Sequence, residues 1–165
     1  MERGFEKRCE RRKRMDGQHY KELLQLAEKI ATKAHTGQLD KAGVPYIYHP
    51  QIVSSYCESI YGKIVGWLHD VIEDTDVTME DLRAQGFDEF LLEALDCVTK
   101  PKVGYDEKAY YDRIKRNPLA KEVKLADLKH NSDMSRIPQG ISEEESRKWI
   151  IRKEKYLEHI EFLTH

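Results

Sequence analysis

Apolar residues recur at helical spacing along nearly the whole chain, and this pattern constrains the fold more than any other feature of the sequence. In residues 19–35, Leu23, Ala27, Ile30 and Ala34 follow the spacing of an amphipathic helix. Comparable patterns predict further helices over residues 50–62, 64–75, 78–86, 88–99, 106–117, 119–137 and 142–163. No segment alternates polar and apolar residues for long enough to indicate a strand. The sequence therefore predicts an all-α fold, a single helical bundle.

Two of the predicted helices begin with a capping pattern. Thr78 precedes Asp81 by three residues, and Ser142 precedes Glu145 by the same spacing. In a capping box the hydroxyl accepts a hydrogen bond from the first turn, and the acidic side chain accepts one from the backbone of the cap. Both patterns predict helix starts at these positions.

The chain is 165 residues long, enough for one domain with a substantial core and too short for two comfortable ones. Its formal net charge of −2 provides no general attraction to nucleic acid or to a membrane. No apolar run approaches the roughly 20 residues needed to cross a bilayer, and the N-terminus has no secretory apolar segment. Cys9, Cys57 and Cys97 are scattered and form no Cys-x-x-Cys pair, which fits a reducing compartment. We therefore expect a cytoplasmic protein with no membrane partner and no clear nucleic-acid binding, its oligomeric state left open.

Residues 1–17 differ from the rest of the chain in charge. Between Arg3 and Arg14, basic residues far outnumber acidic ones. Such a run predicts a solvated N-terminal extension that frays from the domain. A basic arm for nucleic acid is the alternative, although Phe5 is the one aromatic residue among these charges. No linker, repeat or low-complexity tract interrupts residues 18–165, which we expect to form one domain.

The segment IVGWLHDVIEDT, Ile64–Thr75, places ionisable residues where the neighbours suit a buried helix. On a helix, Asp70, Glu73 and Asp74 share one face. Burying an unpaired charge is costly, so a chain that buries His69 and Asp70 usually supplies a metal ion or a partner. A surface helix edge with satisfied charges is the alternative, but the apolar residues on both sides leave no evident polar face. The segment therefore predicts a metal-binding or catalytic role.

Two other segments contain polar residues of the same kind. Within LAKEVKLADLKHNSDM, Asp127 lies on a helical stripe that is apolar at both ends, although an ordinary ion pair is the alternative. In PYIYHP, His49 stands at the predicted start of a helix and can face a cleft, although an ordinary loop residue is the alternative. Two imidazoles and two carboxylates suit manganese or iron better than a structural zinc ion. The candidate metal ligands are His49, His69, Asp70 and Asp127.

Four motifs, taken in order, resemble one known family: AHTGQLDKAGVPYIYHP, WLHDVIEDT, CVTK and VKLADLKHN. They are similar to the hydrolase domain of the RelA/SpoT proteins, which are HD-domain metal-dependent phosphohydrolases. The similarity extends from about Ala34 to Ile137. The family removes the 3′-pyrophosphate of (p)ppGpp, the guanosine tetraphosphate or pentaphosphate of the stringent response. The resemblance implies an HD-type hydrolase domain over residues 18–165.

The resemblance also implies roles for individual residues. One Mn²⁺ ion, or another divalent transition metal, would be held by His49, His69, Asp70 and Asp127. Glu73 and Asp74 would act on the nucleophilic water and the protons, because a carboxylate beside a metal-activated water can accept or relay a proton. Lys41 and Asn131 would contact the substrate.

Asp40 and Leu128 depart from the family pattern, because the relatives usually carry arginine at both positions. One of those arginines packs against guanine. A carboxylate cannot stack on a base and repels nearby phosphates. We therefore expect (p)ppGpp to bind more weakly here than in a hydrolase that carries the arginine. The chain is more similar to the small stand-alone hydrolases, including an animal homologue linked to a nicotinamide dinucleotide phosphate, than to the long enzymes with a synthetase domain.

The function predicted from these residues is a metal-dependent phosphohydrolase of phosphorylated nucleotides, similar to a (p)ppGpp 3′-pyrophosphohydrolase. A broad nucleotide phosphatase, with substrates that include one like NADPH, is an alternative. A non-catalytic nucleotide sensor that kept the fold is a second alternative. The presence of Glu73 and Asp74 beside all four candidate metal ligands argues against the sensor.

Overall fold

The computed structural model describes the backbone of residues 2–165 and the side chains from residue 17 onward. Its helices, in chain order, are α1 (Glu2–Ala34), α2 (Tyr48–Tyr56), α3 (Ile60–Leu68), α4 (Val71–Asp74), α5 (Met79–Ala84), α6 (Glu89–Val98), α7 (Glu107–Arg116), α8 (Pro118–Asn131), the 3₁₀ helix η1 (Met134–Arg136) and α9 (Glu143–Thr164). Within these described residues, extended pairing is limited to an isolated antiparallel bridge between Leu39 and Pro45. The all-α prediction is confirmed.

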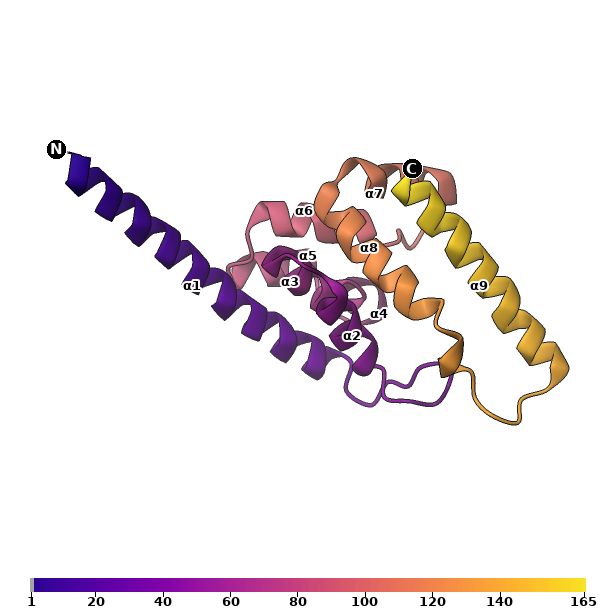
Figure 1. Ribbon diagram of the computed structural model, residues 1–165. Coiled ribbons are helices and arrows are strands. Elements are labelled where there is room, and N and C mark those ends of the chain that lie inside the picture. Colours follow the sequence, from indigo (N-terminus) through magenta and orange to yellow (C-terminus); the bar gives the residue numbers. More distant parts are fainter. Residues whose placement is uncertain (1) are drawn as a thin grey trace.

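Helices α3 and α8 lie at the centre of the bundle. Helix α3 packs against α1, α2, α6 and α8, while α8 also packs against α2, α6, α7 and α9. Figure 1 shows α1 extending beyond the bundle and α9 lying along the other side of α8. The two central helices therefore connect α1, α2, α6, α7 and α9, and the residues at their ends are held from several sides.

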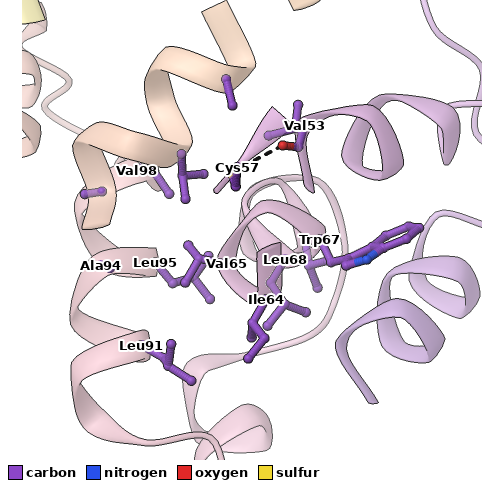
Figure 2. Close-up of a cluster of buried hydrophobic side chains, with 14 of the residues drawn as sticks. Val53, Cys57, Ile64, Val65, Trp67, Leu68, Leu91, Ala94, Leu95 and Val98 are labelled. Atoms are coloured by element: carbon purple, nitrogen blue, oxygen red, sulfur yellow. Dashed lines mark hydrogen bonds between the residues drawn. The ribbon is translucent and has the colours of Figure 1, made fainter. Parts of the chain in front are cut away.

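An apolar core fills the space between α3 and its neighbours (Figure 2). The side chains of Ile64, Leu68 and Leu95 are 0%, 2% and 1% exposed. Burial of such a side chain stabilises the fold by about 1.5–3 kcal/mol relative to leaving it in water. Gly66 allows α2 to approach α3 closely, because a Cβ atom there would lie 2.9 Å from the Cα atom of Ser54. This packing fixes the end of α3, immediately before His69.

The segment predicted as one helix over residues 64–75 is divided in the structure. Helix α3 ends at Leu68, His69 and Asp70 form a turn, and α4 begins at Val71. Side chains of successive helical residues point about 100° apart. An unbroken helix would therefore turn only one of the two residues toward a given point, whereas the turn directs both inward. The prediction of a continuous helix is wrong here.

Two other predicted helices end earlier than expected. The helix predicted over residues 50–62 ends at Tyr56, because the hydroxyl of Ser59 caps α3 by accepting a hydrogen bond from its first turn at 2.8 Å. The helix predicted over residues 119–137 ends at Asn131, and the separate turn η1 follows. Both predicted capping boxes are present, at the starts of α5 and α9.

The predicted boundary at residue 17 falls inside α1, which begins at Glu2. The side chains of residues 1–16 lie outside the described residues, so the basic extension and its solvation stay predictions. In the part of the chain that the structure describes, no helix combines the length and the apolar character needed to cross a bilayer. Cys57 and Cys97 are both free thiols.

Candidate metal centre

His69 is placed by the end of α3. Its side chain is buried, and its Nδ1 atom lies 2.8 Å from the carbonyl oxygen of Gly66, which can only accept a hydrogen bond. Nδ1 therefore carries a proton, and Nε2 is directed toward Asp70, 2.9 Å from its Oδ2 atom. A histidine fixed in this way is oriented to present Nε2 to a metal ion, which would displace the proton from that nitrogen.

The structure brings together all four residues predicted as metal ligands. The Nε2 atoms of His49 and His69 are 3.1 Å apart, and His49 Nε2 lies 3.5 Å from Asp70 Oδ2. From α8, Asp127 Oδ1 approaches His49 Nε2 to 3.1 Å and His69 Nε2 to 3.8 Å. Ligands at about 2.1 Å from one octahedral ion lie about 3 Å from one another, so the spacing suits a divalent cation. His49, His69 and Asp70 form a cluster that could hold a metal ion.

The charges of this cluster are balanced by close partners. Burial disfavours the charged form of His69, but the Asp70 carboxylate outweighs that effect and raises the pKa of His69 to about 9. Burial alone would raise the pKa of Asp70, yet the adjacent His69 holds it well below its usual range. The Asp70 carboxylate is therefore ionised, as a carboxylate ligand of a metal must be.

Asp127 has further partners on its own helix. Burial opposes its charge, but the ammonium of Lys124, 2.8 Å from Asp127 Oδ2, keeps the pKa of Asp127 well below its usual range. The amide of Asn131 donates to the other oxygen, Oδ1, at 2.6 Å. These contacts fix the carboxylate with Oδ1 toward the two histidines. An ion pair was the alternative to a ligand role for Asp127, and the structure holds both arrangements: Oδ2 pairs with Lys124, and Oδ1 faces the two histidines.

His130 was not among the predicted site residues, and it packs directly behind the cluster. Its Nδ1 atom lies 2.7 Å from Nδ1 of His49, and the two rings are stacked. Burial, reinforced by the nearby Arg136 cation, lowers the pKa of His130 to about 4, so the ring is neutral and can accept. Histidines that bind metals commonly have such a hydrogen-bond partner on the ring nitrogen that does not face the metal. Its position one helical turn after Asp127 was the only sequence signal.

Glu73 and Asp74 follow on α4 and line the same cavity as the cluster. Glu73 Oε1 accepts a hydrogen bond from the backbone N–H of Lys100. Burial raises the pKa of both carboxyl groups, and the charge of Asp70 adds to the effect. A raised pKa makes a carboxylate a better proton acceptor near neutral pH.

The cavity has a volume of about 430 Å³, and its lining includes the cations of Lys41, Lys100 and Arg152 beside the carboxylates. Lys41 and Asn131, the predicted substrate contacts, both line it. Partial burial lowers the pKa of Lys41, and the nearby cations of Arg152 and Lys100 lower it further, so these three positive charges are close together. Such crowding is unfavourable unless an anion occupies the space between them. Lys100 and Arg152 were missed because they come from distant parts of the chain.

Asp40 does not present a free carboxylate to the cavity. Its Oδ1 atom accepts hydrogen bonds from the backbone N–H groups of Ala42 and Val44 at 2.8 and 3.0 Å, which closes its own loop. Its Oδ2 atom accepts from Arg136 at 3.0 Å. Leu128, at the second departure from the family pattern, is buried in the core. The repulsion of phosphates expected of Asp40 is therefore offset by an adjacent arginine.

Known proteins support the resemblance carried by the motifs. No family model matches the chain. It is 33% identical over 120 residues to a GTP pyrophosphokinase of Streptomyces coelicolor, a match that covers 66% of this chain and 14% of the relative. It is 42% identical over 78 residues to a guanosine-3′,5′-bis(diphosphate) 3′-pyrophosphohydrolase of Borreliella burgdorferi, covering 45% of this chain and 12% of the relative.

The bifunctional (p)ppGpp synthase/hydrolase SpoT of Escherichia coli is 33% identical over 122 residues, covering 66% of this chain and 17% of that protein. The resemblance to the RelA/SpoT-type hydrolase domain is confirmed. The chain thus spans less than a fifth of the length of these three relatives. A solved structure, described as a metazoan ortholog of SpoT that hydrolyses ppGpp, has the same fold: the TM-score is 0.66 at 22% identity, over 84% of this chain and 85% of that one.

Proposed function

We propose that this chain is a metal-dependent phosphohydrolase that removes pyrophosphate from the 3′ position of (p)ppGpp or a closely related nucleotide. The observation that carries the proposal is the convergence of His49, His69, Asp70 and Asp127 in a cavity that is also lined by lysine and arginine side chains. Relatives that are named guanosine-3′,5′-bis(diphosphate) 3′-pyrophosphohydrolases support the choice of substrate.

Two imidazoles and two carboxylates are a donor set suited to Mn²⁺ or a similar divalent transition metal, and Mn²⁺ is the ion that we propose. A bound ion of this kind supplies a Lewis acid and lowers the pKa of a coordinated water. Lys124 and Asn131 keep Asp127 oriented for it, while His130 supports His49. We assign to His130 Nδ1 the role of accepting a hydrogen bond from the Nδ1–H group of His49, because a neutral His49 that keeps its proton on Nδ1 has an unprotonated Nε2 toward the cluster.

The remaining chemistry falls to side chains around the cavity. Glu73 and Asp74 accept and relay protons, since both carboxyl groups line the cavity and their pKa values are raised by burial. Lys41, Lys100 and Arg152 bind the phosphate oxygens, because no carboxylate forms an ion pair with these three cations within the described part of the chain. Water adds to phosphorus as the bond to the ribose 3′-oxygen breaks, which releases pyrophosphate.

The test is a substrate panel with purified protein that has been stripped of metal and reloaded. Guanosine and adenosine 3′-pyrophosphates, NADPH and inorganic pyrophosphate are each incubated with Mn²⁺, Mg²⁺ or excess chelator, and released phosphate and pyrophosphate are measured. We expect pyrophosphate from the guanosine 3′-pyrophosphates with Mn²⁺ and none with chelator.

Equal turnover of adenine and guanine compounds would instead favour the broad nucleotide phosphatase. Tight binding of a nucleotide without release under any metal would favour the sensor. Release that persists in excess chelator would contradict the metal-dependent mechanism, whichever nucleotide is used.

A further inference from the structure

The ion pair between Asp40 and Arg136 joins two loops that are far apart in the sequence. Asp40 lies in the loop after α1, and Arg136 lies in η1, 96 residues later. The Nη2 atom of Arg136 donates to Asp40 Oδ2 at 3.0 Å, and both residues line the cavity of the candidate metal centre. The pair therefore belongs to the substrate cavity, and neither residue is explained by metal binding.

The guanidinium of Arg136 is held at both ends. While Nη2 donates to Asp40, Nη1 donates to the carbonyl oxygen of His130 at 3.1 Å. The Arg136 side chain is 21% exposed, so the planar group is partly covered rather than extended into water. Because His130 also packs against the ring of His49, the orientation of this plane is tied to the metal cluster. The cavity thus has on its wall a planar cationic group that two hydrogen bonds hold in place.

The charge environment of Arg136 differs from that of the other cations at the cavity. Lys41, Lys100 and Arg152 form no ion pair with a carboxylate among the described residues, whereas the positive charge of Arg136 is compensated by Asp40. A compensated guanidinium attracts phosphate weakly, but its flat face still stacks on an aromatic ring. Leu39, next to Asp40, is 63% exposed and adds apolar surface to the same cavity.

We propose that Arg136 recognises the nucleobase of the substrate by stacking on a purine ring, with Asp40 as the residue that positions it. This proposal rests on the proposed function, since it names the base-recognising group of the same cavity. The ligand class is a purine nucleoside that carries phosphate on its ribose. Phosphate groups bind to the cations that form no ion pair, Lys41, Lys100 and Arg152, and the base lies against the guanidinium and Leu39.

The test compares two ligands that differ only in the base. Guanosine 3′,5′-bisphosphate and the corresponding abasic ribose 3,5-bisphosphate are titrated calorimetrically into metal-free protein, so that binding is measured without turnover. In Arg136→Met the base is expected to lose its partner, and the affinity for the guanosine compound falls by roughly tenfold, in the range of other base-stacking contacts. The affinity for the abasic compound stays within about twofold.

The matched control removes Arg152, a cation of the cavity that forms no ion pair among the described residues. Arg152→Met is expected to weaken both ligands by the same factor, because it removes a phosphate contact and leaves the base unaffected. Asp40→Asn tests the positioning role: its amide oxygen can still accept from the loop N–H groups but no longer carries the charge that holds Arg136. We expect Asp40→Asn to lower affinity for the guanosine compound alone, by less than Arg136→Met does.

Three results would overturn the inference. One is a guanosine compound that binds to the unaltered protein no more tightly than the abasic one, and another is an Arg136→Met variant that weakens both ligands equally. The third is an Arg136→Met variant that folds normally by circular dichroism and changes neither affinity. If Arg136→Met does not fold, Asp40→Asn decides by the same ratio. Loss of turnover with Mn²⁺ in every assay would contradict the proposed function and leave this binding ratio unaffected.

Discussion

The two sides of the α3 terminus are equally buried, yet different forces hold them. Leu68 ends α3 inside the apolar cluster of Figure 2 and is 2% exposed, while the next residue, His69, is 4% exposed among carboxylates. Leu68 contributes to stability through apolar surface removed from water. His69 gains little net stability, because the attraction of Asp70 must first offset the cost of removing both charges from water.

This difference separates the residues that stabilise the fold from those that would carry out its chemistry. Substitutions in the apolar cluster are expected to lower the free energy of unfolding and leave the activity of the folded fraction intact. Substitutions in the His–Asp cluster are expected to abolish metal binding or turnover while the helices still assemble.

The largest effect is expected from Asp70→Ala. It removes an anionic group from the candidate metal cluster, so metal binding and phosphohydrolase activity should be lost together, with the helical content unchanged. Metal per chain by mass spectrometry, phosphate release and circular dichroism are the measurements. Asp76→Ala is the control, because Asp76 is exposed and does not line the cavity. A variant that still binds one metal ion per chain would remove Asp70 from the ligand set.

Glu73→Gln is expected to separate two functions of the site, metal binding and proton transfer. The amide oxygen can still accept the hydrogen bond from the backbone of Lys100, so the local structure should persist. Metal content should stay unchanged while kcat falls by about 10²–10⁴-fold, the usual loss when an acid–base group is removed. Near-normal turnover would exclude Glu73 from proton transfer and leave that role to Asp74, tested alone as Asp74→Asn.

On the apolar side, Leu95→Ala should lower the free energy of unfolding by about 2–5 kcal/mol, because the vacated space cannot fully collapse. Urea denaturation measures the change, and kcat of the folded fraction should stay within about twofold at low temperature. Leu157→Ala is the control: that leucine is 47% exposed, and its truncation should cost less than about 0.5 kcal/mol. A large fall in kcat for Leu95→Ala would mean that the two sides are coupled.

Gly66→Ala is expected to have the smallest effect, and to change both the stability of the apolar cluster and the metal affinity of the His–Asp cluster. The added Cβ would lie 2.9 Å from the backbone of Ser54, and relieving that contact should cost about 1–3 kcal/mol. Because the Gly66 carbonyl also fixes His69, metal affinity should fall modestly with stability. Gly17→Ala is the matched control with no neighbour within 4 Å, and it should stabilise α1 by about 0.5–1 kcal/mol. Unchanged metal affinity in Gly66→Ala would show that the position of His69 does not depend on this backbone contact.

Local patterns in the sequence determined most of the helices and their starts. Helical spacing placed α6, α7, α9 and the end of α1 close to their observed positions, and the pairs Thr78–Asp81 and Ser142–Glu145 cap α5 and α9 as predicted. These features depend on residues three or four positions apart, so they can be interpreted without knowledge of the fold. The same local logic identified His69 and Asp70 as unusual, because their neighbours are apolar.

Only the tertiary structure decided the contacts between distant segments. His49 meets His130 across 81 residues, and Asp40 meets Arg136 across 96. The interruption of the helix at His69 likewise could not be predicted, because it depends on the packing of α3 against several neighbours. From the sequence alone, Asp40 indicates only that the arginine which packs against guanine in the relatives is missing here. Its partner becomes apparent only when the loop after α1 and the turn after α8 are placed side by side, since side-chain spacing along the sequence carries no information about such approaches.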